Sequence, residues 1–331
     1  MVCLTESAQT AILRASMAEI ENVVIIGSGC AGWTAALYTA RANLRPLLYT
    51  GVQTGGLLTT TSIVENYPGF PEGVDGTDLM IKMQKQAERF GARTQLGSTI
   101  ERVDFSARPF KLWDDLDKLI EARTVIIAVG ASHRHLGLAS EEILSKEGGV
   151  TYCATCDGAL PRFRNQPLVV VGGGDSACEE ATYLTRFGSK VYLVHRRDQL
   201  RASKIMTDRA LSNPKIEPVW DSVVEDIFDV KQHSVTGVRL KNIKTGVSRE
   251  ISCSGVFVAI GHEPSTKVFR DQIECDEHGY ILCKKGSATT VEGVFASGDC
   301  VDRVYRQAIT AAGMGCAAAI DAERYLATHE S

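Results

Sequence analysis

Two cysteines separated by two residues, Cys153 and Cys156, have the spacing in this chain that best suits redox chemistry. Their sulfurs can bond across one turn, and a helix beginning there would stabilise a thiolate at its N-terminus, so the pair predicts a redox-active disulfide. Asp157 follows directly and is the candidate group that gives or takes the proton of thiol–disulfide exchange. A structural zinc site normally needs a second ligand pair at matching spacing, and none is apparent, so no metal is expected.

A glycine-rich turn between an apolar strand and a helix occurs twice. The first follows the strand expected at 23–26, and the second follows the strand expected at 168–171. In such turns the first glycine permits the tight turn, the second lets a pyrophosphate approach the backbone, and a small third residue lets helix and strand pack. The following helices, expected at 33–42 and 178–187, would direct free N–H groups at the phosphates. The chain therefore predicts two dinucleotide sites; the alternative is a pair of turns that bind nothing.

A basic cluster follows the second turn, where the strand 191–194 ends. It consists of His195, Arg196, Arg197 and Arg201. An NAD site normally has an acidic residue there for the ribose 2′-hydroxyl, whereas arginines suit the 2′-phosphate of NADP. The second unit is therefore predicted to bind NADPH; the alternative is a solvated basic loop. The residues assigned to its turn are Gly172, Gly174, Asp175 and Ser176.

The first unit has no such cluster, because its second strand, 47–50, ends in neither acid nor base. A C-terminal strand, 294–299, ends instead in Gly298 and Asp299, whose carboxylate is suited to accept hydrogen bonds from a ribityl chain. A small-residue helix then opens at Arg306, Gln307 and Ala308, with its N-terminus toward a flavin ring. The first unit is therefore predicted to bind FAD.

Two further strands, 124–130 and 255–261, bracket the second unit and indicate one domain inserted into another. The predicted fold is α/β, with two Rossmann-like, three-layer ββα domains. The FAD domain comprises 20–130 and 262–331, and the NADPH domain, which carries the dithiol, comprises 131–261. The crossings fall near 130–134 and 261–265, and residues 1–19 are expected to be a disordered leader.

Composition excludes several other classes of protein. The chain has 331 residues, 44% hydrophobic, and 36 basic against 40 acidic side chains give a net charge of −4. This is ordinary globular composition, with no sign of a nucleic-acid partner. No run of roughly 20 apolar residues predicts a membrane span. Ten cysteines without an export signal indicate a reducing compartment, the cytoplasm, and most of these cysteines are expected to be buried packing residues.

Taken together, these motifs resemble those of the NADPH-dependent thioredoxin reductases of the low-molecular-weight type. The resemblance covers about residues 21–327. It also includes the threonines at 59–61 and the segment 65–70.

The resemblance implies a role for each matching residue. Cys156 would be the thiol nearest the flavin, Cys153 would attack the disulfide of thioredoxin or a similar small dithiol protein, and Asp157 would be the general acid. The arginines of the basic cluster would bind the NADPH 2′-phosphate. The family is homodimeric and uses a rotation between its domains. The residues implied for FAD are Ser28, Gly29, Cys30, Ala31, Asn66, Asp299, Arg306, Gln307 and Ala308.

Three positions depart from the family pattern. Leu57 stands where a glutamine is usual, so one amide contact to the flavin is missing, and Cys30 and Cys300 replace a common proline and a common valine. The alternatives considered are a flavin-dependent dithiol oxidase, the reductase of a peroxide-reducing system, and a non-catalytic nucleotide sensor or zinc protein. The oxidase would not need the basic cluster, the peroxide system normally has an extra N-terminal redox domain, and the dithiol with its adjacent acid argues against the last class.

Overall fold

The computed structural model describes residues 20–61, 63–145 and 147–329, so the predicted leader lies outside the described residues. The chain divides into two compact units. Unit 1 comprises the chain up to Ile63, Tyr67–Ser132, and the chain from Pro264 onward. Unit 2 comprises Val64–Asn66 and His133–Glu263.

Unit 1 is built on a mixed sheet whose central strand is the apolar run before the first glycine turn. Val24 and Ile25 are fully buried, and Val24 lies opposite Leu47 on one side and Val125 on the other. The long strand β8 pairs in parallel near its end and antiparallel near its start, which joins the two halves of the sheet. The order is β5 (Arg93–Gln95), β2 (Leu47–Tyr49), β1 (Glu21–Ile26), β8 (Leu119–Ile127), β7 (Phe110–Asp114) and β6 (Ile100–Asp104), with β19 (Val294–Ala296) also paired to β8.

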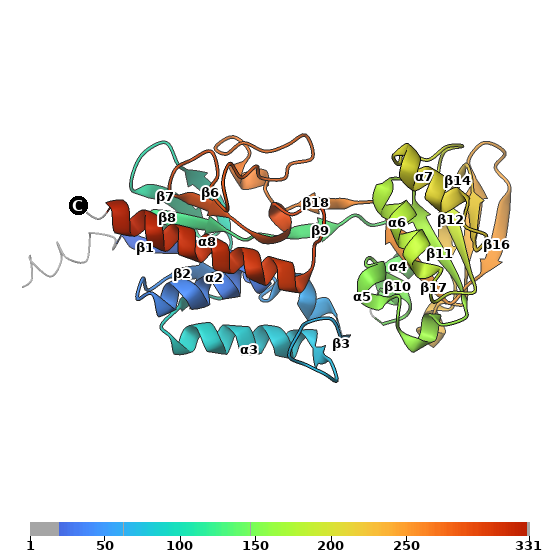
Figure 1. Cartoon of the computed structure of the whole chain (residues 1–331), viewed down its shortest axis with the longest axis horizontal. Helices are drawn as coiled ribbons and strands as arrows, with labels where there is room; N and C mark the ends of the chain where they lie inside the picture. The colour runs from blue at the N-terminus through green and yellow to red at the C-terminus, as the bar shows by residue number, and fades with distance from the viewer. Residues whose placement is uncertain (1–19, 62, 146, 330–331) are drawn as a thin grey trace, which may run out of the picture. The chain divides into compact units, whose positions relative to one another are not determined.

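Three helices pack in unit 1: α2 (Cys30–Arg41), α3 (Gly76–Arg89) and α8 (Ala308–His329). Figure 1 shows α8, in red, lying alongside α2, in blue. Small residues permit this approach. A Cβ atom on Gly315 would lie 2.1 Å from the carbonyl oxygen of Ala31, so any larger residue there would separate the helices.

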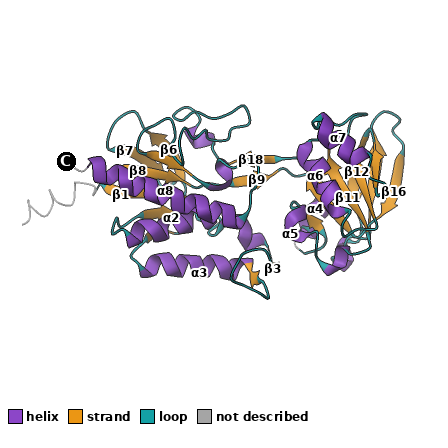
Figure 2. Ribbon diagram, in the orientation of Figure 1, coloured by secondary structure: helices purple, strands orange, loops and turns teal. Residues whose placement is uncertain are grey.

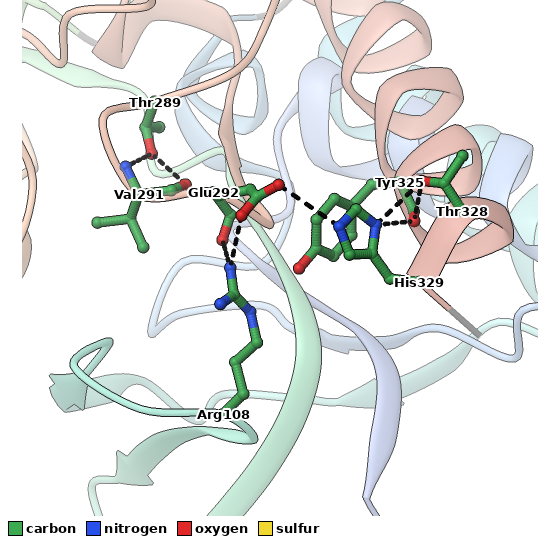
Figure 3. A network of polar contacts seen from close by, with 7 residues as sticks. All are labelled: Arg108, Thr289, Val291, Glu292, Tyr325, Thr328 and His329. Atoms are coloured by element: carbon green, nitrogen blue, oxygen red, sulfur yellow. Dashed lines mark hydrogen bonds and ion pairs between the residues drawn. The ribbon is translucent and has the colours of Figure 1, made fainter. Parts of the chain in front are cut away.

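The end of α8 is joined to two loops by a surface network (Figure 3). Arg108 donates to the backbone carbonyl of Glu292 at 2.7 Å, and the Glu292 carboxylate also lies 3.5 Å from Nε2 of His329. The ring of His329 stacks on Tyr325 at a centroid distance of 4.1 Å. Exposed contacts of this kind each contribute little, about 1 kcal/mol or less, so the apolar sheet and helices dominate the stability of unit 1.

Unit 2 contains a parallel sheet, an antiparallel sheet and two main helices. The parallel strands are short apolar runs, typical of strands buried on both faces, and Val169 and Val256 are fully buried neighbours. Figure 2 shows α6 and α7 along one side of these strands. The parallel order is β10 (Val150–Thr151), β17 (Gly255–Ala259), β11 (Pro167–Gly172), β12 (Lys190–Val194) and β13 (Ile216–Val219); the antiparallel order is β14 (Ser222–Ile227), β15 (Gly237–Asn242) and β16 (Ser248–Ser252); the helices are α6 (Asp175–Leu184) and α7 (Lys204–Leu211).

Short elements complete the structure. The strands β9 and β18, which pair with each other, lie within the predicted crossings 130–134 and 261–265. No helix within the described ranges is both long enough and apolar enough to span a membrane. The short elements are β3 (Ile63–Val64), β4 (Val74–Asp75), β9 (Ala131–His133), β18 (His262–Pro264), α4 (Ala139–Leu144), α5 (Ala154–Asp157), and the 3-10 turns η1 (Gly56–Thr60), η2 (Pro161–Phe163), η3 (Val230–Gln232), η4 (Lys267–Phe269) and η5 (Gly298–Cys300).

The predicted α/β class with two Rossmann-like units is confirmed, but several element bounds were wrong. The helices predicted at 33–42 and 178–187 begin three residues earlier, because Gly29 and Gly174 are extended N-caps and each helix starts directly after them. The strand predicted at 294–299 ends at Ala296 and turns into η5. The last helix begins at Ala308 rather than Arg306, because Arg306 has a φ of 47°, which is not helical.

Candidate active site with a dithiol and two glycine turns

The predicted disulfide between Cys153 and Cys156 is present, at the start of α5. Cys153 is the N-cap of that short helix, and its sulfur accepts a hydrogen bond from the backbone N–H of Cys156 at 3.2 Å. Cys156 is exposed and Cys153 is half-buried. A backbone N–H directed at the Cys153 sulfur would stabilise a thiolate there after reduction, as the sequence predicts.

Asp157 lies half-buried beside the disulfide. Burial raises the pKa of its carboxyl, while a hydrogen bond from the Thr151 hydroxyl and the charge of Arg162 partly oppose that rise. The same hydroxyl accepts the backbone N–H of Cys153 at 3.3 Å. Thr151 therefore connects the acid to the dithiol, a role that the sequence reasoning missed because a lone threonine has no recognisable signal. A carboxyl with a raised pKa holds its proton to higher pH, which suits a proton donor to a leaving thiolate.

The three glycine positions of the first turn have different spatial roles. A Cβ on Gly27 would lie 2.2 Å from the Ala128 carbonyl oxygen, and one on Gly32 would lie 1.9 Å from the Gly27 carbonyl oxygen. A Cβ on Gly29 would meet no atom of the described residues within 4 Å. The first and third glycines are therefore required for packing, whereas the second leaves open space at the N-terminus of α2. This is the arrangement that a pyrophosphate needs.

Ser28, Cys30 and Ala31 lie buried around this opening. The Ser28 hydroxyl donates to the Thr50 carbonyl at 2.7 Å and accepts the Gly55 N–H at 2.9 Å, so its side chain already braces the turn internally. Burial, together with the charge of Asp299, raises the pKa of the Cys30 thiol to about 12. Cys30 is therefore a protonated packing residue in this structure.

Asp299 lies in η5, and its Oδ1 atom is buried without a hydrogen-bond partner among the described residues. Burial raises the pKa of this carboxyl to about 6, with the nearby Asp302 adding to the effect. Gly298 brings Asp299 close to the first turn, since a Cβ on Gly298 would lie 2.9 Å from that of Ala31. A buried acceptor without a donor is costly unless a ligand supplies one, and a ribityl hydroxyl of FAD would do so.

Asp302 organises the loop that presents Arg306 and Gln307. Its two carboxylate oxygens accept the backbone N–H groups of Val304, Tyr305 and Arg306 at 2.8–2.9 Å. The sequence reasoning missed Asp302, although an aspartate shortly before a helix start is a usable turn signal. Asn66, the remaining residue predicted for FAD, is exposed between β3 and β4 and falls in unit 2, apart from the others, which all lie in unit 1.

The second turn repeats the plan of the first with different neighbours. A Cβ on Gly172 would lie 2.4 Å from the Ala259 carbonyl oxygen, whereas one on Gly174 would meet no atom within 4 Å in the part of the chain that the structure describes. Oδ1 of Asp175 accepts both the backbone N–H and the hydroxyl of Ser203, at 2.8 and 2.9 Å. Asp175 therefore joins the turn to the start of α7 through this oxygen, and its place in the cofactor site stays a prediction. Ser176 is half-buried beside it.

Two residues of the basic cluster, Arg197 and Arg201, line an open pocket of about 260 Å³ together with residues 198–200. Arg196, Arg197 and Arg201 are exposed, and the Arg201 N–H donates to the Gly173 carbonyl at 2.7 Å, which holds the loop against the turn. His195 is buried, and a Cβ on Gly173 would overlap its ring. Burial first, then the arginines, lower the pKa of His195, so it is neutral near pH 7. The three arginines are thus available to a phosphate.

Among the described residues, no group of three or more His, Cys, Asp or Glu side chains is arranged to hold a metal ion.

Comparison with known proteins gives matches over nearly the whole chain. The profile of the pyridine nucleotide-disulphide oxidoreductases matches residues 21–315. The chain is 53% identical to thioredoxin reductase 2 of Arabidopsis thaliana, over 92% of this chain and 82% of that protein. It is 50% identical to the thioredoxin reductase of Streptomyces clavuligerus, over 94% and 95%. The solved thioredoxin reductase of Streptococcus pyogenes MGAS5005 is 41% identical, covers 94% of this chain and 100% of that chain, and superposes with a TM-score of 0.87.

Proposed function

The chain belongs to the thioredoxin reductases of the pyridine nucleotide-disulphide oxidoreductase family, and from this membership we infer that it is a flavoprotein that reduces thioredoxin at the expense of NADPH. The proposal rests on two features together. The disulfide, whose Cys153 is the N-cap of a short helix, lies beside the half-buried acid Asp157. Two glycine-rich turns each leave open space at their second glycine. The FAD fit is supported by the unpartnered Oδ1 of Asp299 and the open space at Gly29. FAD, when bound, supplies the two-electron exchange that connects NADPH with the disulfide.

The residues of the chain divide the remaining work. Gly29 leaves room for the FAD pyrophosphate, and Ala31 covers it. The flavin end is held by Asp299, Arg306, Gln307 and Ala308. Gly174 admits the NADPH pyrophosphate, and Arg196, Arg197 and Arg201 hold its 2′-phosphate. An oxidase has no need of these arginines, so no observation favours that alternative. The cysteines outside the disulfide are free thiols among the described residues, which supports a reducing compartment, the cytoplasm.

At the reduced dithiol, the thiolate of Cys153 attacks one sulfur of the thioredoxin disulfide and displaces the other as a thiolate. Asp157 gives its proton to that leaving thiolate. Cys156 then gives its proton to the Asp157 carboxylate and attacks the Cys153 sulfur as a thiolate. This breaks the mixed disulfide between Cys153 and thioredoxin and restores the internal disulfide. The second thioredoxin sulfur leaves as a thiolate, which takes a proton from Asp157 or water, so that thioredoxin is released in its reduced form. In the oxidised structure Cys156 is the more exposed residue of the two, so exposure does not by itself favour Cys153 as the attacking thiol. Single variants decide the assignment.

The test is NADPH oxidation by the full, FAD-loaded protein with and without oxidised thioredoxin. We expect turnover to require thioredoxin and to be lost, by a factor of about a thousand or more, in Cys156→Ser and in Cys153→Ser, since either change removes the disulfide. The matched control is Cys275→Ser, which alters a half-buried free thiol of unit 1 and should keep normal turnover. A thioredoxin mixed disulfide that accumulates on Cys153 in Cys156→Ser supports the assigned order. Normal turnover in Cys156→Ser would refute the proposal.

We also propose that the protein is a homodimer. Support comes from apolar side chains such as Tyr38 and Ile309, which unit 1 leaves exposed on α2 and at the start of α8. Light scattering on the purified FAD-loaded protein should give a mass of two chains, and a mass of one chain would contradict the proposal.

A further inference from the structure

One carboxylate stands within the basic cluster. Asp198 lies between Arg197 and Arg201 in sequence and lines the same cavity as both. It is exposed and has no need of an internal partner. An NAD site uses an acidic residue near the end of the strand that corresponds to β12 to bind the ribose 2′-hydroxyl. A free Asp198 carboxylate would therefore oppose the function of the arginines, by repelling a 2′-phosphate and by pairing with their guanidinium groups.

Lys244 neutralises that carboxylate. Its Nζ atom lies 2.8 Å from Oδ2 of Asp198 and 3.0 Å from Oδ1 of Asp221, so one ammonium group bridges two acids. The hydrogen bond and the charge of Lys244 lower the pKa of Asp198, which keeps the carboxylate ionised and paired. The bridge is anchored, because the Asp221 side chain is mostly buried, with 15% of its area exposed, whereas Asp198 has 62% exposed.

The backbone fixes both ends of this bridge. Lys244 lies in the tight turn between β15 and β16, where Oδ1 of Asn242 accepts the backbone N–H of Lys244 at 3.0 Å. Asp221 donates its N–H to the Arg197 carbonyl at 3.1 Å and accepts the N–H of Ile243 at 2.7 Å. Hydrogen bonds therefore connect the turn that carries Lys244, the loop at Asp221 and the loop that carries the arginines. Lys244 lies far from these arginines in the sequence but belongs to the same connected structure.

We propose that Lys244 is a positioning residue for cofactor choice: by holding the Asp198 carboxylate, it leaves the arginines of the cluster free for the 2′-phosphate and prevents Asp198 from serving a ribose 2′-hydroxyl. The inference rests on the proposed NADPH site. It does not require Lys244 to touch the cofactor.

The experiment compares binding of adenosine 2′,5′-bisphosphate with binding of 5′-AMP by calorimetry on the full-length protein. Low salt is used, because at 0.1 M salt the interactions between exposed charges are largely screened beyond about 10 Å. Lys244→Met should reduce the preference for the 2′-phosphate roughly two- to fivefold, the range for exposed ion pairs. In steady-state assays the KM for NADPH should rise by the same factor with kcat unchanged. Lys244→Arg should keep most of the preference.

Two further variants separate this mechanism from simpler ones. Asp198→Asn added to Lys244→Met should restore the preference, because the carboxylate that Lys244 restrains is gone. Lys241→Met, which removes a cation of the same hairpin paired with Glu225 at 3.2 Å, should change nothing.

Each contrary outcome has one meaning. An unchanged preference in Lys244→Met overturns the inference. A preference that falls and is not restored by Asp198→Asn also overturns it, because Lys244 would then act on the phosphate itself. A wild-type protein that binds both nucleotides equally refutes the NADPH site of the proposed function instead.

Discussion

The two glycine-rich turns share one backbone plan but have different neighbours. In both, the first position packs against a carbonyl of the adjacent strand, at 2.2 Å for a Cβ on Gly27 and 2.4 Å for one on Gly172, while the second position faces open space. The surroundings then diverge. The first turn has a half-buried acid from the C-terminal part of the chain, Asp299, whose Oδ1 atom is buried. The second turn has an exposed arginine loop that follows it closely in sequence. We infer that each turn admits a dinucleotide and that the residues around it, distant or close in the sequence, select which one binds.

The largest effect on stability should come from a substitution at the third small residue of the turn, which is Gly32 in the first turn and Ala177 in the second. Gly32→Ala would place a Cβ 1.9 Å from the Gly27 carbonyl oxygen, and because that neighbour is backbone, it cannot move aside cheaply. We expect a loss of about 3 kcal/mol or more in the free energy of unfolding, measured by urea denaturation. Ala177 already occupies the matching position in unit 2, so the control Ala177→Gly should cost only about 1 kcal/mol. Equal effects of the two changes would show that the turns are packed alike.

A second large effect should separate the two nucleotides. Replacing Arg196 and Arg197 together with glutamine removes two charged donors to the 2′-phosphate, each worth about 1.5–3 kcal/mol. The KM for NADPH should therefore rise about a hundredfold or more, while the KM for NADH and the FAD content stay near their wild-type values. Similar changes for NADPH and NADH would place the 2′-phosphate elsewhere. The control Arg209→Gln changes an arginine near the end of α7, outside the cavity, and should alter neither constant.

Sequence reasoning recovered features that depend on local pattern and missed those that depend on tertiary contacts. The apolar strands, both glycine turns and the disulfide follow from short motifs with direct physical reasons. The helix starts were misplaced by three residues, because each helix begins directly after its glycine N-cap rather than at its first large apolar residue. Thr151, Asp302 and Lys244 were not found, since each acts through a partner that only the folded chain brings near. The hydrogen bond between Asp175 and Ser203 was also missed, because the motif places Asp175 in the turn but does not indicate its partner at the start of α7.

The pH dependence of the unfolding free energy tests the role assigned to Asp299 beside the first turn. Its pKa is about 6 in the folded protein against an ordinary value of 3.8, so between these pH values the folded state binds more protons than the unfolded state. The free energy of unfolding of the FAD-free protein should therefore fall as the pH rises from about 4 to about 6, by about 3 kcal/mol at most. Asp299→Asn should remove this fall and should also weaken FAD binding about tenfold, because a charge-assisted acceptor is lost. Urea denaturation at several pH values and FAD titration measure the two effects, and an unchanged pH dependence in the variant would contradict the assignment.

The smallest expected effect is also the most selective, because the second glycines can be changed without disturbing the fold. Within residues 20–61, 63–145 and 147–329, a Cβ on Gly29 or on Gly174 meets no atom closer than 4 Å. Both residues have negative φ, −70° and −94°, which alanine readily adopts. Alanine at either position should leave the unfolding free energy within about 1 kcal/mol of the wild type. It would, however, occupy space that a pyrophosphate needs, so we expect Gly29→Ala to weaken FAD binding and Gly174→Ala to weaken NADPH binding, each about tenfold. Each variant is the control for the other: FAD titration and NADPH titration should respond to opposite members of the pair. If either alanine weakened both cofactors, or neither, the open space at these glycines would not be where the phosphates bind, and the shared plan of the two turns would be a matter of packing alone.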